Sequence, residues 1–118
     1  MVGSDRALVA GIPELLLLQL LARRSMYGYE LAKAVRVTSR EAISIGEGVL
    51  YPALHALKQK RLLRARRRSI DGRTRIYYEV TARGRIRLAR LTAEWRRLAG
   101  GVAAIVGQRR GVAIRPSR

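Results

Sequence analysis

The chain has 118 residues, of which 48% are apolar, and its 25 basic and 8 acidic residues give a net charge of +17. This length accommodates one domain, or one small domain with an extension, and the apolar content is too high for a disordered basic tail. Because the chain has no cysteine and only one histidine, a disulfide scaffold, a cysteine-based zinc site and a site built from several histidines are excluded.

The sequence contains no recognisable catalytic constellation. Its carboxylates are scattered without an acid–base partner, and no glycine-rich phosphate loop follows a predicted strand, so we expect neither an enzyme nor a cofactor. The apolar run over residues 7–22 is broken by Pro13 and Glu14, and its longest uncharged piece, residues 15–22, has 8 residues, whereas a membrane-spanning helix needs about 20. Glu14 argues against a signal peptide. We therefore expect a cytoplasmic protein without a membrane partner.

The positive charge is concentrated in the second half of the chain. Residues 1–50 contain 6 basic and 5 acidic residues, whereas residues 51–118 contain 19 basic and 3 acidic residues. In the densest stretch, residues 58–75, 9 basic residues are opposed by Asp71 alone. Such a concentration repels itself unless a polyanion lies against it, so nucleic acid is the favoured partner. A solvated basic surface that only aids solubility is the alternative.

Two helices are predicted in the first third of the chain. The first begins at Pro13 and Glu14, because proline and a carboxylate both suit a first helical turn, and its run of leucines places it at the centre of the core. Residues 25–28 form a turn, and a second helix follows over residues 29–38.

A third helix is predicted to begin near residue 47 or 48 and to end near residue 61. Leu50, Leu54 and Leu57 recur at spacings of four and three and define its buried face. Pro52 is expected in about the first turn, since deeper in the helix it would remove a backbone hydrogen bond.

A β-hairpin is predicted around Asp71-Gly72, a strong signal for a tight turn. Residues 63–68 form its first strand and residues 73–80 its second. Side chains alternate along a strand, so Ile76, Tyr78 and Val80 share one face of the second strand.

A long helix is predicted over residues 82–106, with Thr81 as its N-cap. Apolar residues recur along it at steps of three and four, as in a dimerisation seam: Leu88, Leu91, Trp95, Leu98, Val102 and Ile105. The helix would be about 37 Å long, which is longer than is needed to cover a core of three short helices and a hairpin. Part of the seam is therefore expected to meet a second copy of the chain.

Three helices followed by a basic hairpin is the order of a winged helix-turn-helix, a mostly α fold with a two-stranded β wing (α+β). In this fold the third helix enters the major groove and the wing lies against the DNA backbone or minor groove. We therefore expect a DNA-binding domain over residues 1–81, a dimerisation helix over residues 82–107 and a basic disordered tail over residues 108–118. The expected DNA-contacting residues are Tyr51, His55, Lys58, Lys60, Arg66, Arg67, Arg68, Arg73 and Arg75.

Two of these residues have open alternatives. Tyr51 either faces the groove or packs under the wing. His55 either reaches a base or phosphate or is an exposed histidine without a special role.

Several short motifs occur in a fixed order over residues 14–106. They are Tyr27-Gly28-Tyr29-Glu30-Leu31, Gly48-Val49-Leu50-Tyr51-Pro52-Ala53-Leu54, Asp71-Gly72-Arg73, Tyr77-Tyr78-Glu79-Val80-Thr81 and Gly84. Each is weak alone, but in their order and spacing the chain resembles the PadR-like transcriptional regulators. Its single C-terminal helix and short length resemble their small subfamily.

This resemblance implies a homodimer, joined through its last helices, that represses transcription from a pseudo-palindromic operator and is released by a small hydrophobic or aromatic effector. In drug-sensing relatives a tryptophan on this helix stacks on flat effectors at the dimer interface, and Trp95 lies at a matching place. Leu15, Leu18 and Leu98 are the further expected lining residues. The alternative is that Trp95 only anchors the core or the interface.

The chain departs from the family pattern in two places. Val49 stands where the family usually has threonine, so a hydroxyl contact to DNA is missing. Lys58, Lys60 and Arg61 stand where it usually has an acidic residue and a glycine before the wing, which favours non-specific binding.

Two other functions compete with a specific regulator. An architectural or weakly specific DNA-binding protein would use the same fold without effector control. A protein-interaction module would bind an acidic protein and would bind DNA weakly even at low salt. RNA binding lacks support because no stacking aromatics are expected on an exposed sheet.

Overall fold

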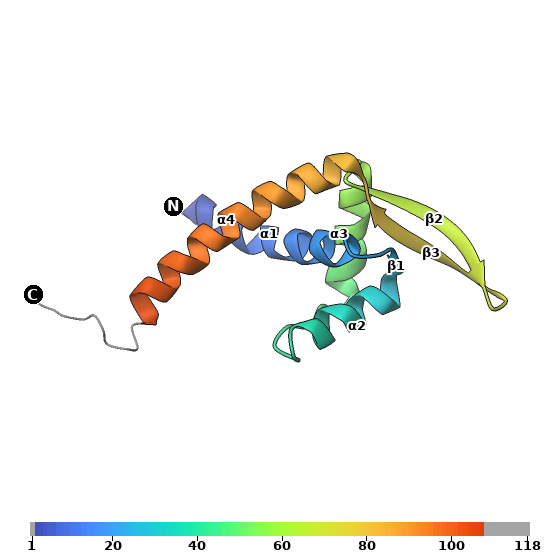
Figure 1. The fold of residues 1–118 in the computed structure, drawn as a ribbon, viewed down its shortest axis with the longest axis horizontal. Helices are drawn as coiled ribbons and strands as arrows, with labels where there is room; N and C mark the ends of the chain where they lie inside the picture. The colour runs from blue at the N-terminus through green and yellow to red at the C-terminus, as the bar shows by residue number, and fades with distance from the viewer. Residues whose placement is uncertain (1, 108–118) are drawn as a thin grey trace, which may run out of the picture.

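Four helices and a small antiparallel sheet make up residues 2–107, the part of the chain that this computed structural model describes (Figure 1). In chain order the elements are α1 (Val2–Leu21), β1 (Met26–Tyr27), α2 (Gly28–Thr38), α3 (Glu47–Gln59), β2 (Leu63–Ile70), β3 (Arg73–Val80) and α4 (Ala82–Val106). This is the predicted winged helix-turn-helix of the α+β class, with a long C-terminal helix. The tail expected over residues 108–118 lies outside the described residues.

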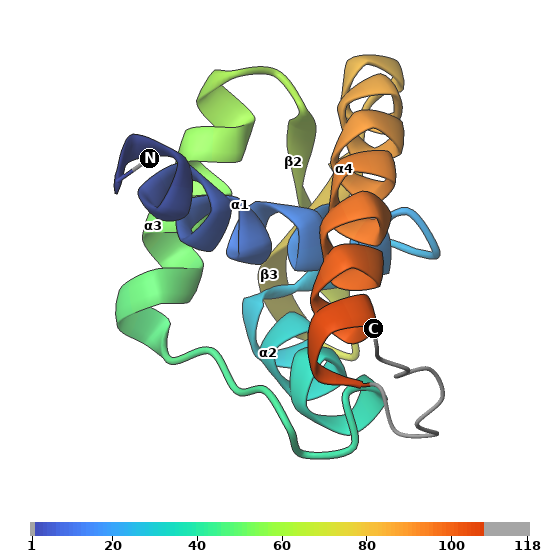
Figure 2. The same cartoon turned by 90° about the vertical axis from the view of Figure 1, so that its left-hand side faces the viewer.

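The second half of α1 lies at the centre of the core, as its leucines predict. It contacts α2, α3, α4 and β3, and in Figure 2 it lies between α3 on one side and α4 on the other. Leu17 and Leu18 have no exposed surface. The core around them is almost entirely aliphatic: Leu20, Leu21, Met26, Leu31, Val35, Leu50, Leu54, Leu57, Leu62, Leu63 and Leu91.

The start of α1 differs from the prediction. The helix begins at Val2, so Pro13 lies inside it rather than in its first turn. Because proline fixes φ within the helical range, helical backbone can continue on both sides of Pro13, although the proline removes one backbone hydrogen bond. Pro52 is likewise the sixth residue of α3 and lies in its second turn rather than its first.

The strand β1 was not predicted, because the sequence indicated only a turn over residues 25–28. Its two residues pair with β3, Met26 opposite Tyr78 and Tyr27 opposite Tyr77, which gives a sheet of order β1-β3-β2. Two residues are too short to show an alternating pattern. The strand forms only because the turn between α1 and α2 meets the edge of β3.

The hairpin and the last helix agree with the prediction. Asp71 and Gly72 have φ values of 54° and 77°, both positive as a type I′ turn requires, and β2 extends two residues beyond its predicted end. Thr81 caps α4, whose boundaries are those predicted, by accepting a hydrogen bond from the Gly84 amide at 3.0 Å. Within the described residues, no helix is long and apolar enough to cross a membrane.

Candidate nucleic-acid interface

The angle between α2 and α3 is fixed by a tyrosine lying on a glycine. Gly28 is the first residue of α2, and a β-carbon built there would lie 2.7 Å from Cζ of Tyr51 in α3. No larger residue fits without moving the ring, so the two helices meet at this contact. Tyr51 thus packs against α2, while 45% of its surface remains exposed.

The solvent-facing side of α3 begins with Glu47, carries mostly apolar side chains besides Tyr51 over the next turns, and is polar at its end. Gly48, Val49, Pro52 and Ala56 are exposed there, and so are His55, Lys58 and Gln59. On this side Tyr51, His55 and Gln59 have uncharged groups that can hydrogen-bond a base edge. Lys58 and Lys60 lie at the end of the helix that leads to the wing.

The wing, formed by β2 and β3, has two different faces. Leu63, Tyr78 and Val80 pack on the core side, and Arg67, paired opposite Ile76, continues this face beyond the core. Arg67 and Arg73 are exposed. Within the described residues, neither makes a hydrogen bond or an ion pair.

On the outer face of the wing, one carboxylate offsets part of the positive charge. Glu79 of β3 lies 3.1 Å from Nε of Arg66 and 3.9 Å from a terminal nitrogen of Arg64. All three side chains are partly exposed, so each ion pair contributes at most about 1 kcal/mol to stability. Arg66 is therefore less available to a polyanion than its exposure suggests.

Farther along the outer face, two arginines stack on tyrosine rings. The guanidinium carbon of Arg68 lies 4.6 Å from the centre of the Tyr77 ring, and that of Arg75 lies 4.3 Å from the centre of the Tyr27 ring. The two rings meet edge to face, with centroids 5.4 Å apart. These contacts cover Tyr77, which is 7% exposed although it points away from the main core.

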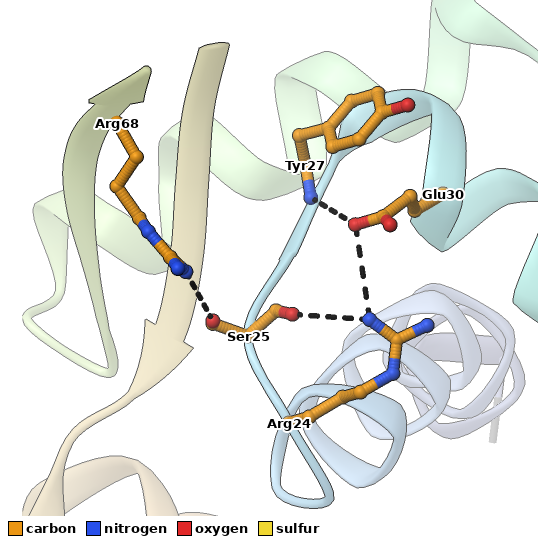
Figure 3. A network of polar contacts seen from close by, with 5 residues as sticks. All are labelled: Arg24, Ser25, Tyr27, Glu30 and Arg68. Carbon is orange, nitrogen blue, oxygen red and sulfur yellow. Dashed lines mark hydrogen bonds and ion pairs between the residues drawn. The ribbon is translucent and has the colours of Figure 1, made fainter. Parts of the chain in front are cut away.

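The same cluster joins the wing to the start of α2 (Figure 3). Nη1 of Arg68 donates a hydrogen bond to Oγ of Ser25 at 3.4 Å. The amide of Tyr27 donates to Oε1 of Glu30 at 3.3 Å, and Arg24 lies 3.8 Å from that oxygen. Glu30 thus satisfies a free amide at the N-terminus of α2.

The base of the wing is locked to the start of α4. The hydroxyl of Thr81 donates to the carbonyl of Arg61 at 2.7 Å, and the amide of Thr81 donates to the carbonyl of Leu62 at 3.1 Å. A β-carbon at Gly84 would lie 2.8 Å from Cγ1 of Val80 and 3.1 Å from the carbonyl carbon of Leu62. Glycine is therefore required where α4 crosses the loop between α3 and β2.

A basic hollow of about 460 Å³ lies beside this crossing, between the end of α3 and the first turns of α4. It is lined by Lys60, Leu62, Arg83, Ile86, Arg87 and Arg90. Arg87 is anchored by Glu14, with Nε 3.0 Å from one carboxylate oxygen, and this hydrogen bond raises the pKa of Arg87 despite the opposing effect of burial. The hollow extends the positive surface from α3 toward α4.

The apolar seam of α4 divides into two parts. Leu88 and Leu91 pack against the core of their own chain. Farther along, Leu98 is half-buried, whereas Trp95, Val102 and Ile105 are 41%, 60% and 82% exposed. Figure 1 shows this second half of α4 continuing past the rest of the domain.

The expected effector residues are also divided. Trp95 is exposed, and Leu15 and Leu98 are half-buried. Leu18, however, lies wholly inside the core of the single chain.

The residues of the tyrosine–arginine cluster were not all foreseen. The sequence predicts no specific contact for Tyr27 or Tyr77, and it places Ser25 only in a turn. The alternation Arg73, Arg75, Tyr77 along one face of a strand is the signal that could have indicated stacking.

Comparison with known proteins agrees with this geometry. The profile of the Transcriptional regulator PadR-like family matches residues 17–90. An uncharacterized protein of Lysinibacillus sphaericus is 30% identical over 96 residues, which cover 80% of this chain and 86% of that protein.

Solved structures share the fold. A transcriptional regulator from Clostridium thermocellum has a TM-score of 0.76 at 26% identity, covering 83% of this chain and 93% of that one. A PadR family transcription regulator from Clostridium difficile has a TM-score of 0.72 at 30% identity, covering 81% and 99%. The chain belongs to the PadR-like family of transcriptional regulators, and it is therefore a DNA-binding regulator with a winged helix-turn-helix and not an enzyme.

Proposed function

We propose that the chain is a homodimeric repressor that binds a pseudo-palindromic operator in the cytoplasm and is released by a small hydrophobic or aromatic effector at the dimer interface. The observation that carries this proposal is the exposed apolar stripe on the second half of α4. In a single chain Trp95, Val102 and Ile105 have no core to cover. Large exposed apolar groups at steps of three and four are typical of a helix that pairs with another helix.

The DNA interface would be formed by α3 and the wing. The recognition face of α3 would enter the major groove with Tyr51, His55 and Lys58 on it, and Lys60 would meet the backbone. Arginines of the wing would lie against phosphates or the minor groove. In a symmetric dimer two such surfaces would contact half-sites about one helical turn, or 34–36 Å, apart.

The effector would bind where the two copies of α4 meet. Trp95 supplies a flat ring for stacking, and the half-buried Leu15 and Leu98 supply apolar walls. Leu18 would line this space only if α1 and α4 separated, because it has no exposed surface in the single chain.

Repression and release are tested by transcription in vitro from the promoter of the chain's own gene. The proposal predicts that the purified protein lowers transcript yield, and that flat aromatic compounds which quench Trp95 fluorescence restore it. Unchanged transcription with bound protein would argue against a repressor. Quenching without restored transcription would argue against release by that effector.

The small number of base-reading side chains on the exposed side of α3 favours one alternative, a weakly specific or architectural DNA-binding protein. Bidentate contacts to guanine come from arginine or lysine, and those to adenine from asparagine or glutamine. Among the exposed residues of α3 only Lys58 and Gln59, both in its last turn, are of these types. A specific regulator binds its operator at least about 10³-fold more tightly than other DNA. A smaller ratio would favour the architectural function.

A further inference from the structure

Besides Arg64 and Arg66, which pair with Glu79, the other four arginines of the wing fall into two groups according to their contacts. Arg68 and Arg75 stack on Tyr77 and Tyr27, and Arg68 also donates to Ser25. Arg67 and Arg73 have no such partner among the described residues. Neighbours in the sequence thus differ in their freedom to meet a polyanion.

Arg67 also differs from the stacked arginines in position. Side chains alternate along a strand, so Arg67 lies on the side of the sheet that packs toward the core, where β2 also contacts α3. Arg68 and Arg75 lie on the opposite side, over the turn that leads into α2. Arg73 shares the face of Arg75 by alternation, but it lies at the tip of the hairpin, directly after the turn.

We propose that Arg68 and Arg75 are positioning residues, which hold the wing against β1 and the start of α2, and that Arg67 and Arg73 carry the phosphate contacts of the wing. This assignment rests on the proposed DNA interface. Tyr27 belongs to β1 and precedes the first residue of α2, so the stack transmits the position of the helix-turn-helix to the wing. The angle between α3 and the wing is then set before DNA binds, so the wing does not have to become ordered on binding.

The two roles predict different effects on DNA binding. Removing a phosphate contact lowers the salt slope of the affinity by about one. Removing one exposed cation–π contact changes the equilibrium between the docked and the undocked wing by about two- to fivefold. It would lower affinity by that factor at every salt concentration and leave the slope unchanged, because the number of released counterions stays the same.

The test compares two adjacent charge-removing variants of the full chain, Arg67→Gln and Arg68→Gln. Binding to a fluorescein-labelled duplex from the promoter region of the chain's own gene is measured between about 50 and 200 mM salt. Hydrogen exchange of the β2 and β3 amides is measured without DNA. We expect Arg67→Gln to lower the slope by about one with unchanged exchange. We expect Arg68→Gln to keep the slope, weaken binding and speed exchange by about two- to fivefold.

A third variant separates charge from stacking. Arg68→Lys keeps the positive charge but loses the planar guanidinium, and lysine does not replace arginine at stacked sites. The proposal predicts that its wing amides exchange about as fast as those of Arg68→Gln. Wild-type exchange in Arg68→Lys would show that charge alone matters and would overturn the positioning role.

The remaining outcomes distinguish this proposal from the proposed DNA interface. A lower slope in Arg68→Gln, or wild-type exchange in that variant, would overturn the division of roles while leaving the wing on DNA. An unchanged slope in Arg67→Gln would overturn the phosphate contact of Arg67, while the proposed function would fall only if the wild-type chain showed no preference for its operator.

Discussion

Arg61 adopts a backbone conformation that suits glycine better than arginine. Its φ is 63°, and it follows the C-cap of α3 in a Schellman motif, in which the Leu62 amide donates to the Leu57 carbonyl at 2.9 Å and the Arg61 amide to the Lys58 carbonyl at 2.9 Å. The left-handed conformation costs a residue with a β-carbon about 1–2 kcal/mol, and the unfolded-state entropy of glycine offsets part of that gain.

Arg61→Gly is therefore expected to raise the free energy of unfolding by about 0.5–1 kcal/mol. The measurement is urea denaturation followed by circular dichroism. Lys60→Gly is the matched control, because Lys60 has a φ of −81° and should gain nothing. Equal or lower stability in Arg61→Gly would show that the arginine side chain stabilises this turn.

Gly28 and Gly48 give a second matched pair. A β-carbon at Gly28 meets the Tyr51 ring, whereas nothing lies within 4 Å of one at Gly48. Gly28→Ala should lower the free energy of unfolding by about 1–3 kcal/mol through overpacking. Gly48→Ala should raise it by up to about 1 kcal/mol through helix propensity. Both are read from denaturant midpoints, and a Gly28→Ala chain as stable as wild type would contradict the Tyr51 contact.

Among the elements, those with a local signal were predictable and those that depend on pairing were not. The Asp71-Gly72 turn and the Thr81 cap are encoded within a few residues, so β2, β3 and α4 were placed to within two residues. The strand β1 needs β3 as a partner, and the stacking of Arg68 on Tyr77 needs the register of the hairpin. Leu91 fits the seam by spacing, yet tertiary packing places it in the core of its own chain.

The second half of α4 can be tested as an element. Replacing Val102 and Ile105 together by glutamate puts charge on the exposed stripe without touching the core, so we expect a folded monomer. Arg97→Glu changes the net charge by the same amount at an exposed position off the stripe and should leave a dimer. Light scattering gives the mass and circular dichroism the helix content. A dimer in the double variant would refute pairing through this stripe.

In the whole molecule, α4 would couple the proposed dimer interface to the DNA surface, because its start is locked to the base of the wing by Thr81 and Gly84. An effector that changes the pairing of α4 would shift the two wings relative to each other. Trp95→Ala is expected to abolish the effector response while leaving operator affinity unchanged. The measurement is operator binding with and without effector. A retained response would make Trp95 an interface anchor only.

The proposed repressor requires two copies of this chain to recognise one specific site together. This is tested by a footprint on genomic fragments that include the promoter of the chain's own gene, at near-physiological salt and with excess competitor DNA. We expect one protected site with two half-sites about one helical turn apart. Even protection of all fragments, with no preferred site, would contradict this expectation and would identify the chain as an architectural DNA-binding protein.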